Sequence, residues 1–71
     1  MSEHLQREIE SLKKEILTVA TLVEESLRDS VRAFLKRDAT LAKKVIDGDA
    51  KIDEKEVEVE EECLKILALH Q

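Results

Sequence analysis

The sequence predicts an all-α protein: an antiparallel two-helix hairpin that completes a helical bundle by oligomerisation. Three observations lead to this prediction. The 71-residue chain has no proline and one glycine, and charged residues make up 41% of it and hydrophobic residues 42%, which is typical of long helices. Apolar residues recur at intervals of three and four, the spacing of one helix face. A short polar break divides this pattern near the middle of the chain.

The first helix is predicted over about residues 2–36. Ser2 suits an N-cap, and Glu3 favours the positive end of the helix dipole. After Val23 the apolar residues step repeatedly by four, which predicts a locally relaxed supercoil. Further apolar residues beside the seam indicate two neighbouring helices rather than one. The predicted seam consists of Leu5, Ile9, Leu12, Ile16, Val19, Val23, Leu27, Val31 and Phe34.

The second helix is predicted over about residues 39–70. Lys36 and Arg37 suit a helix C-terminus, and Asp38 suits the next N-cap. Because the connection is short, the two helices should be antiparallel neighbours. The predicted seam consists of Leu41, Val45, Ile52, Val59, Cys63 and Ile66, with a second apolar row of Ala42, Ile46, Val57, Leu64 and Leu67 beside it.

Residues 1–71 form at most one domain, and two helices alone bury too little apolar surface for a stable core. We therefore expect a homo-oligomer, most simply a dimer of hairpins that forms a four-helix bundle. Gly48 lies inside the second helix, either as a tolerated defect or bend, or as a small residue that lets a partner helix or an ion approach the backbone.

Charge and composition exclude several classes of function. The net charge of −5 leaves no basic face for nucleic acid. No apolar run approaches the length of a membrane span, and the N-terminus has no signal-peptide core. Cys63 is the only cysteine, so an internal disulfide is impossible, which fits a reducing compartment. We expect a cytoplasmic protein that is not inserted in a membrane.

The main candidate site is a row of carboxylates on the second helix. Asp49, Asp53, Glu56 and Glu60 are spaced by four, three and four, which places them on one helix face within the arc of its apolar residues. Burying neighbouring carboxylates is costly, so a metal ion or the Lys and Arg residues of another helix should face them. Hard divalent cations and iron favour such oxygen ligands. Asp49, Asp53 and Glu56 are the predicted metal ligands.

Other residues give weaker signals. His4 and His70 should lie near the same end of the hairpin, as frayed surface histidines, and Cys63 should be a small core residue. The sequence has no nucleophile–base pair, no glycine-rich phosphate loop and no zinc-type cluster, so we expect no enzyme. A small helical enzyme of the chorismate-mutase type is disfavoured because no inward-facing set of arginines is evident.

The spacing of residues along both helices resembles the PhoU family of phosphate-uptake regulators. The second helix contains Leu41-Ala42-x-x-Val45-Ile46-x-Gly48-Asp49-x-x-Ile52-Asp53-x-x-Glu56 and then Glu62-Cys63-Leu64-x-x-Leu67-Ala68-Leu69. The first contains Leu22-Val23-Glu24-x-x-Leu27-x-x-Ser30-Val31-x-Ala33-Phe34-x-x-x-Asp38. The resemblance implies two three-helix repeats that bind metal, often iron, through acidic motifs, and Asp49-x-x-x-Asp53 matches one such motif. The chain would then be a fragment, the N-terminal part of the first repeat.

The resemblance also implies a function. Such a protein would act with the phosphate ABC transporter and its sensor kinase, and would repress phosphate uptake and phosphate-starvation signalling through protein contacts. The alternative is a structural helical hairpin that oligomerises without any metal role, its acidic row paired with Lys and Arg of a partner.

Overall fold

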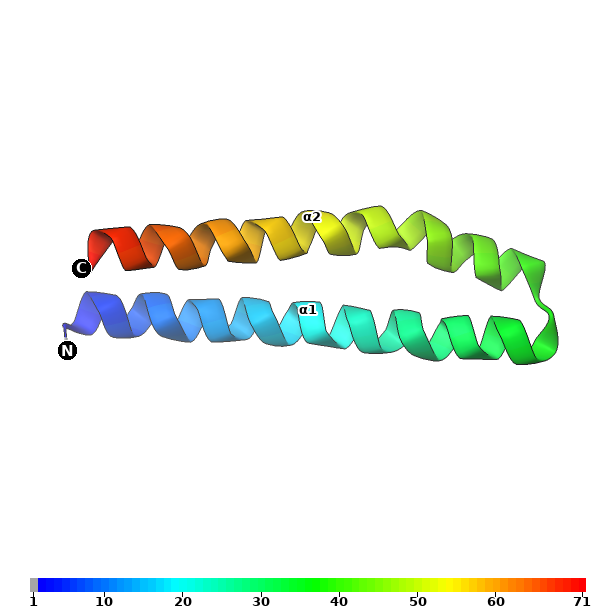
Figure 1. The fold of residues 1–71 in the computed structure, drawn as a ribbon. Coiled ribbons are helices and arrows are strands. Elements are labelled where there is room, and N and C mark those ends of the chain that lie inside the picture. The colour runs from blue at the N-terminus through cyan, green and yellow to red at the C-terminus, as the bar shows by residue number, and fades with distance from the viewer. Residues whose placement is uncertain (1) are drawn as a thin grey trace.

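A computed structural model describes residues 2–71 as two helices, α1 (Glu3–Lys36) and α2 (Ala39–Leu69). The helices lie side by side and antiparallel, with both termini at the same end of the molecule (Figure 1). The hairpin is 52 Å long and 15 by 12 Å across. The predicted all-α hairpin is therefore confirmed, and each helix end lies within one residue of its predicted position.

Both helices begin at a capping side chain. The backbone N–H of Leu5 donates to the Ser2 hydroxyl oxygen over 3.1 Å. In the same way the N–H of Leu41 donates to the Asp38 carboxylate over 3.0 Å. Each bond satisfies a donor that has no partner inside its own helix. The two predicted N-caps are confirmed.

The connection consists of only two residues. Arg37 adopts the left-handed conformation, with φ 52° and ψ 44°. Its N–H donates to the carbonyl of Phe34 over 3.3 Å, and the N–H of Asp38 donates to that of Ala33 over 2.9 Å. This pair of bonds satisfies carbonyl groups at the end of α1, in a left-handed capping geometry in which glycine is the usual residue. Since Asp38 also caps α2, the chain reverses at once and the helices become antiparallel neighbours.

The interhelix seam follows a regular heptad spacing. Its residues recur at intervals of three and four, with one gap in each helix. In α1 it contains Leu5, Glu8, Leu12, Val19, Leu22, Ser26, Asp29 and Ala33, and in α2 Leu41, Val45, Gly48, Ile52, Val59, Glu62 and Ile66. Among the described residues only Ala33 and Ile66 are buried, at 6% and 9% exposure. The core is therefore a thin line between two helices.

The predicted seam is wrong in the second half of α1. Its last four members are exposed: Val23, Leu27, Val31 and Phe34, the last at 81%. Ile16, in the first half, is 45% exposed. The heptad spacing continues instead through polar and small residues such as Ser26 and Ala33, so the predicted stutter does not relax the contact with α2. The apolar stripe turns away from the seam and is left without a neighbour.

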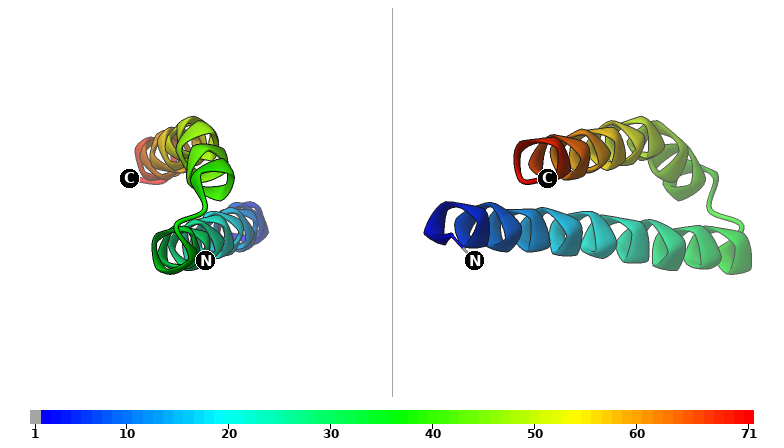
Figure 2. Two further views of the ribbon diagram at one scale, coloured as in Figure 1. Left: turned by 90° about the vertical axis from the view of Figure 1, so that its right-hand side faces the viewer. Right: turned by 60° about the vertical axis from the view of Figure 1, so that its left-hand side comes forward.

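In α2 the predicted seam is correct except at one position. Cys63 is exposed, so its prediction as a core residue is wrong, because the seam passes through Glu62 instead. Gly48 lies half-buried in the seam, yet a Cβ built on it meets no atom within 4 Å in this hairpin. The stretch of α2 that contains it, yellow-green in Figure 1, curves visibly in both further views (Figure 2). A bend therefore describes Gly48 better than a close contact with α1.

Candidate functional site

The four predicted carboxylates form one row on the outside of α2. Asp49, Asp53, Glu56 and Glu60, together called the acidic patch from here on, are all exposed. We expected them on the packing side of α2, which is wrong for the contact with α1. Asp49, Asp53 and Glu60 each follow directly after a seam residue, and Glu56 follows the gap at position 55, so all four lie to the side of the seam. Among residues 2–71, none of the ion pairs shorter than 4 Å involves the acidic patch.

The acidic patch lies within a larger surface, the open face, made of the residues that follow each seam position, with the gaps at positions 15 and 55 counted as seam positions. A residue is rotated by 100° from the one before it, and the two helices run in opposite directions, so these residues lie on the same side of both helices. From α1 the open face contains Gln6, Ile9, Lys13, Ile16, Ala20, Val23, Leu27, Ser30 and Phe34, and from α2 Ala42, Ile46, Asp49, Asp53, Glu56, Glu60, Cys63 and Leu67.

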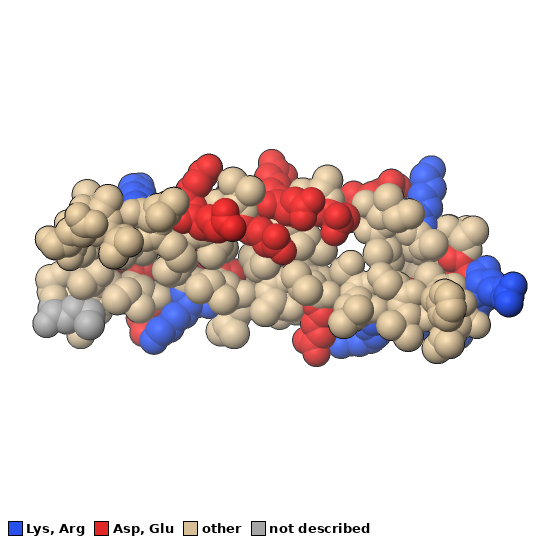
Figure 3. Space-filling view, viewed as in Figure 1, with Lys and Arg blue, Asp and Glu red and all other residues tan. Residues whose placement is uncertain are grey.

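Figure 3 views this side of the molecule. Asp and Glu side chains gather over the middle of α2, whereas α1 shows mostly uncharged residues with a few scattered charged ones. Along α2 the carboxylates are preceded by Ala42 and Ile46 and followed by Cys63 and Leu67. The open face is therefore apolar at both ends of α2 and acidic in its middle.

The acidic patch has the oxygen ligands of a metal site, but its side chains do not converge on one point. Carboxylate oxygens are the ligands that hard cations and iron take. Within the described part of the chain, however, no three Asp, Glu, His or Cys side chains come together so that they could hold a metal ion. Asp49, Asp53 and Glu56 lie in a row along one helix, which can contact a cation from one side only. They stay predicted ligands.

A second cluster of titratable residues joins the two ends of the chain. The carboxylate of Glu8 lies 2.7 Å from Nε2 of His4 and 3.1 Å from Nε2 of His70. The two imidazole rings are 6.1 Å apart. The sequence correctly predicts that the histidines share one end of the hairpin, but they are not frayed, since both contact Glu8. The i, i+4 spacing of His4 and Glu8 is the signal that could have indicated this cluster.

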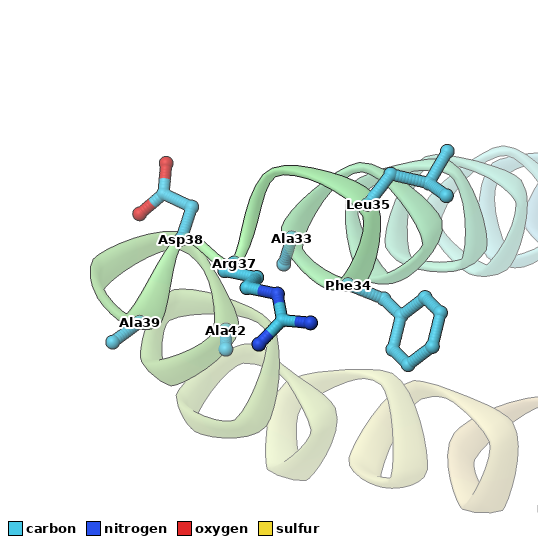
Figure 4. A pocket seen from close by; sticks show the side chains of 7 residues that line it. All are labelled: Ala33, Phe34, Leu35, Arg37, Asp38, Ala39 and Ala42. Carbon is cyan, nitrogen blue, oxygen red and sulfur yellow. The ribbon is translucent and has the colours of Figure 1, made fainter.

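The turn end of the hairpin is hollowed. The hollow is lined by the last turn of α1, the connection and the first turn of α2, and its residues are Ala33, Phe34, Leu35, Arg37, Asp38, Ala39 and Ala42. Figure 4 shows Leu35 pointing away from α2. With Phe34 and Leu35 exposed at 81% and 74%, this end also presents apolar surface to its surroundings.

Both helices and the acidic patch match a known protein family. The PhoU domain family matches residues 16–71. The chain belongs to the PhoU family. This match includes all of α2 and the acidic patch, whereas His4 and Glu8 lie outside it. The resemblance in the spacing of both helices is thereby confirmed.

Three relatives are named as accessory proteins of the phosphate-specific transport system. The PhoU protein of Escherichia coli (strain K12) is 35% identical over the whole of this chain, and that of Edwardsiella tarda is 38% identical over 90% of it. The PhoU homolog of Aquifex aeolicus (strain VF5) is 37% identical over 92%. The chain spans 30%, 26% and 29% of the length of these relatives, respectively. No solved structure matched the chain.

Proposed function

We propose that this PhoU-family chain is an accessory regulator of a phosphate transport system that limits phosphate uptake and phosphate-starvation signalling by binding other proteins. The observation that carries the proposal is the PhoU match over residues 16–71, together with relatives named as accessory proteins of phosphate-specific transport. Its partners are the phosphate ABC transporter and its sensor kinase, which it contacts from the cytoplasm. It catalyses no reaction and acts through its surfaces.

The open face is the contact surface in this proposal. Large apolar side chains such as Leu27 and Phe34 are exposed on it at 65% and 81%, and exposed apolar patches of this kind mark protein interaction sites. The chain self-associates through this surface as a homo-oligomer. No helix among residues 2–71 is both long and apolar enough to cross a membrane.

Metal binding is the second part of the proposal. Asp49, Asp53 and Glu56 bind iron or another divalent cation, which supplies the positive charge that the surrounding open face lacks apart from Lys13. Support comes from the oxygen chemistry of these side chains and from their place on one exposed helix face. The cation orders the helices around it and takes part in no chemical step.

The regulatory role can be tested in bacteria that lack their own PhoU protein. Expression of the chain should lower phosphate uptake and the output of a phosphate-starvation reporter relative to an empty vector. Leu27→Asp places a charge on the open face and should abolish this effect. Leu17→Asp is the matched control, because Leu17 is equally exposed, at 66%, and lies outside the open face. Uptake and reporter output equal to those of the empty vector would contradict the proposal.

One observation favours a second candidate, a structural hairpin without a metal role. Among the described residues no group of three potential ligands converges, so the acidic patch would then serve only as a charged surface. Elemental analysis of the purified protein, combined with thermal melts with and without added iron, separates the two candidates. Bound metal and a raised melting temperature support the metal role, and the absence of both supports the structural hairpin.

A further inference from the structure

The positive charge of the chain is concentrated at the turn end of the hairpin. Residues 30–46, called the basic tip from here on, contain five Lys and Arg residues and one acidic residue, a net charge of +4. The rest of the chain contains seven Lys and Arg residues against sixteen Asp and Glu residues, a net charge of −9. The five cations of the basic tip are Arg32, Lys36, Arg37, Lys43 and Lys44. The hairpin is therefore a rod with one positive end and a negative body.

These five cations are available to a partner outside the hairpin. All of them are exposed, and none takes part in the ion pairs shorter than 4 Å among the described residues. Asp38, the one carboxylate within the basic tip, already accepts the N–H of Leu41 over 3.0 Å. In Figure 3, Lys and Arg side chains project from the turn end at the right, and the Asp and Glu side chains gather over the middle of α2.

Large apolar side chains are exposed among the cations of the basic tip. Val31, Phe34, Leu35 and Ile46 are 51%, 81%, 74% and 71% exposed. Phe34 and Ile46 lie on the open face, whereas Leu35 points away from α2 (Figure 4). Arg37 lines the same hollow as Phe34 and Leu35. Apolar and cationic side chains therefore lie on more than one side of the tip and do not form a single flat patch.

This combination fits the surface of an anionic lipid bilayer. Clusters of Lys and Arg are attracted to anionic headgroups, and the boundary between headgroups and acyl chains takes up exposed Phe and Leu side chains. A protein partner would need matching sockets around both sides of the tip, whereas a fluid bilayer surface surrounds apolar side chains from every direction.

The acidic body of the hairpin determines how the chain can approach such a surface. The nearest acidic residues beyond the basic tip are Asp29 and Asp47, seven residues from Lys36 and eight from Ala39. They lie about 10–12 Å along the helices from the turn, at 1.5 Å per residue. This distance exceeds the Debye length of about 8 Å at physiological ionic strength, so their repulsion by anionic headgroups is screened when the turn approaches first. A hairpin that lies flat would place its acidic body against the headgroups.

We propose that the basic tip docks the hairpin, turn end first, on the surface of a bilayer that contains anionic lipids. The five cations bind the lipid phosphates, the apolar side chains of the tip enter the headgroup region, and the long axis of the hairpin points away from the bilayer. This inference depends neither on the proposed regulatory role nor on metal binding. It leaves the acidic patch and most of the open face in the solution, where a protein partner can reach them.

Sedimentation with lipid vesicles tests the role of the cations. In about 0.1 M NaCl, the chain should bind vesicles made of equal parts phosphatidylglycerol and phosphatidylcholine, and should not bind vesicles of phosphatidylcholine alone. Arg32→Gln with Lys36→Gln should weaken this binding about thirtyfold. The matched control is Arg7→Gln with Lys14→Gln, which removes one Arg and one Lys from exposed positions in the other half of α1 and should not weaken it. Equal binding to both kinds of vesicle, or equal losses in the two variants, would overturn the inference.

The orientation has its own test, because the chain contains no tryptophan. Leu35→Trp places a single fluorescent reporter at the basic tip, and its emission should shift to shorter wavelength on addition of the phosphatidylglycerol vesicles. Leu17→Trp is the control, since Leu17 is 66% exposed near the middle of α1, and its emission should stay unchanged. Equal shifts at both positions would overturn the docking with the turn first. Binding to polyglutamate in solution without binding to the vesicles would overturn the inference in favour of an acidic protein partner.

Discussion

Replacing Ile66 by alanine should remove a large part of the stability of the hairpin. Ile66 is the most buried large side chain among the described residues, at 9% exposure. It packs the C-terminal end of α2 against α1. Truncating buried isoleucine to alanine costs about 2–5 kcal/mol, and the thin core places Ile66→Ala in the lower half of that range, at about 2–3 kcal/mol. A domain of this length is stable by only about 4–10 kcal/mol. The variant should therefore lose about a fifth to three quarters of its free energy of unfolding.

Leu64→Ala is the matched control for this substitution. It removes the same number of carbon atoms from the same turn of α2, but Leu64 is 66% exposed and faces away from the seam. Its cost should stay below about 0.5 kcal/mol. Urea denaturation followed by circular dichroism measures both variants. Equal losses at the two positions would refute the assignment of the seam to the heptad line through Ile66.

Three further predictions concern the bend at Gly48, the connection between the helices and the contact between the two ends of the chain. Gly48→Ala should raise the free energy of unfolding by up to about 1 kcal/mol in urea melts, because alanine favours the helix and a Cβ meets no atom there; a loss would reveal a contact made by a second chain. Arg37→Gly should also stabilise, by about 1 kcal/mol, since glycine tolerates the φ of 52° without strain, and an unchanged melt would argue against the left-handed turn. Glu8→Gln should speed amide hydrogen exchange at both ends of the chain, because it weakens the contacts to His4 and His70. Exchange that is faster at only one end would contradict the joint contact.

The sequence predicts the helices and their ends well, because these depend on local chemistry. Ser2 and Asp38 are capping residues with a single suitable role, and a two-residue break leaves the chain no other path than an antiparallel return. The line of contact is harder to predict, since apolar residues lie on more than one side of each helix. Val23 and Leu22 are adjacent and equally apolar, and only the relative rotation of the two helices decides which of them enters the seam.

The candidate site shows the same limit. The spacing of Asp49, Asp53 and Glu56 correctly predicts that they share one helix face. That another helix covers this face stays a prediction from the apolar residues beside them. The spacing of residues along one helix does not reveal which other helix packs on that face. Glu8 was missed for a related reason: its contact with His70 joins residues at opposite ends of the chain, and only the folded hairpin brings them together.

One hairpin leaves its open face uncovered, and in the proposed function a second chain covers it. The most direct test is the free energy of unfolding measured at several protein concentrations, from about 1 to 100 µM, in the presence of Mn²⁺. For a dimer that unfolds to separate chains, mass action shifts the apparent free energy by about 1.4 kcal/mol for each tenfold change in concentration. We expect the free energy of unfolding to rise with protein concentration in this way. A free energy of unfolding that is independent of concentration would contradict the covering of the open face by a second chain.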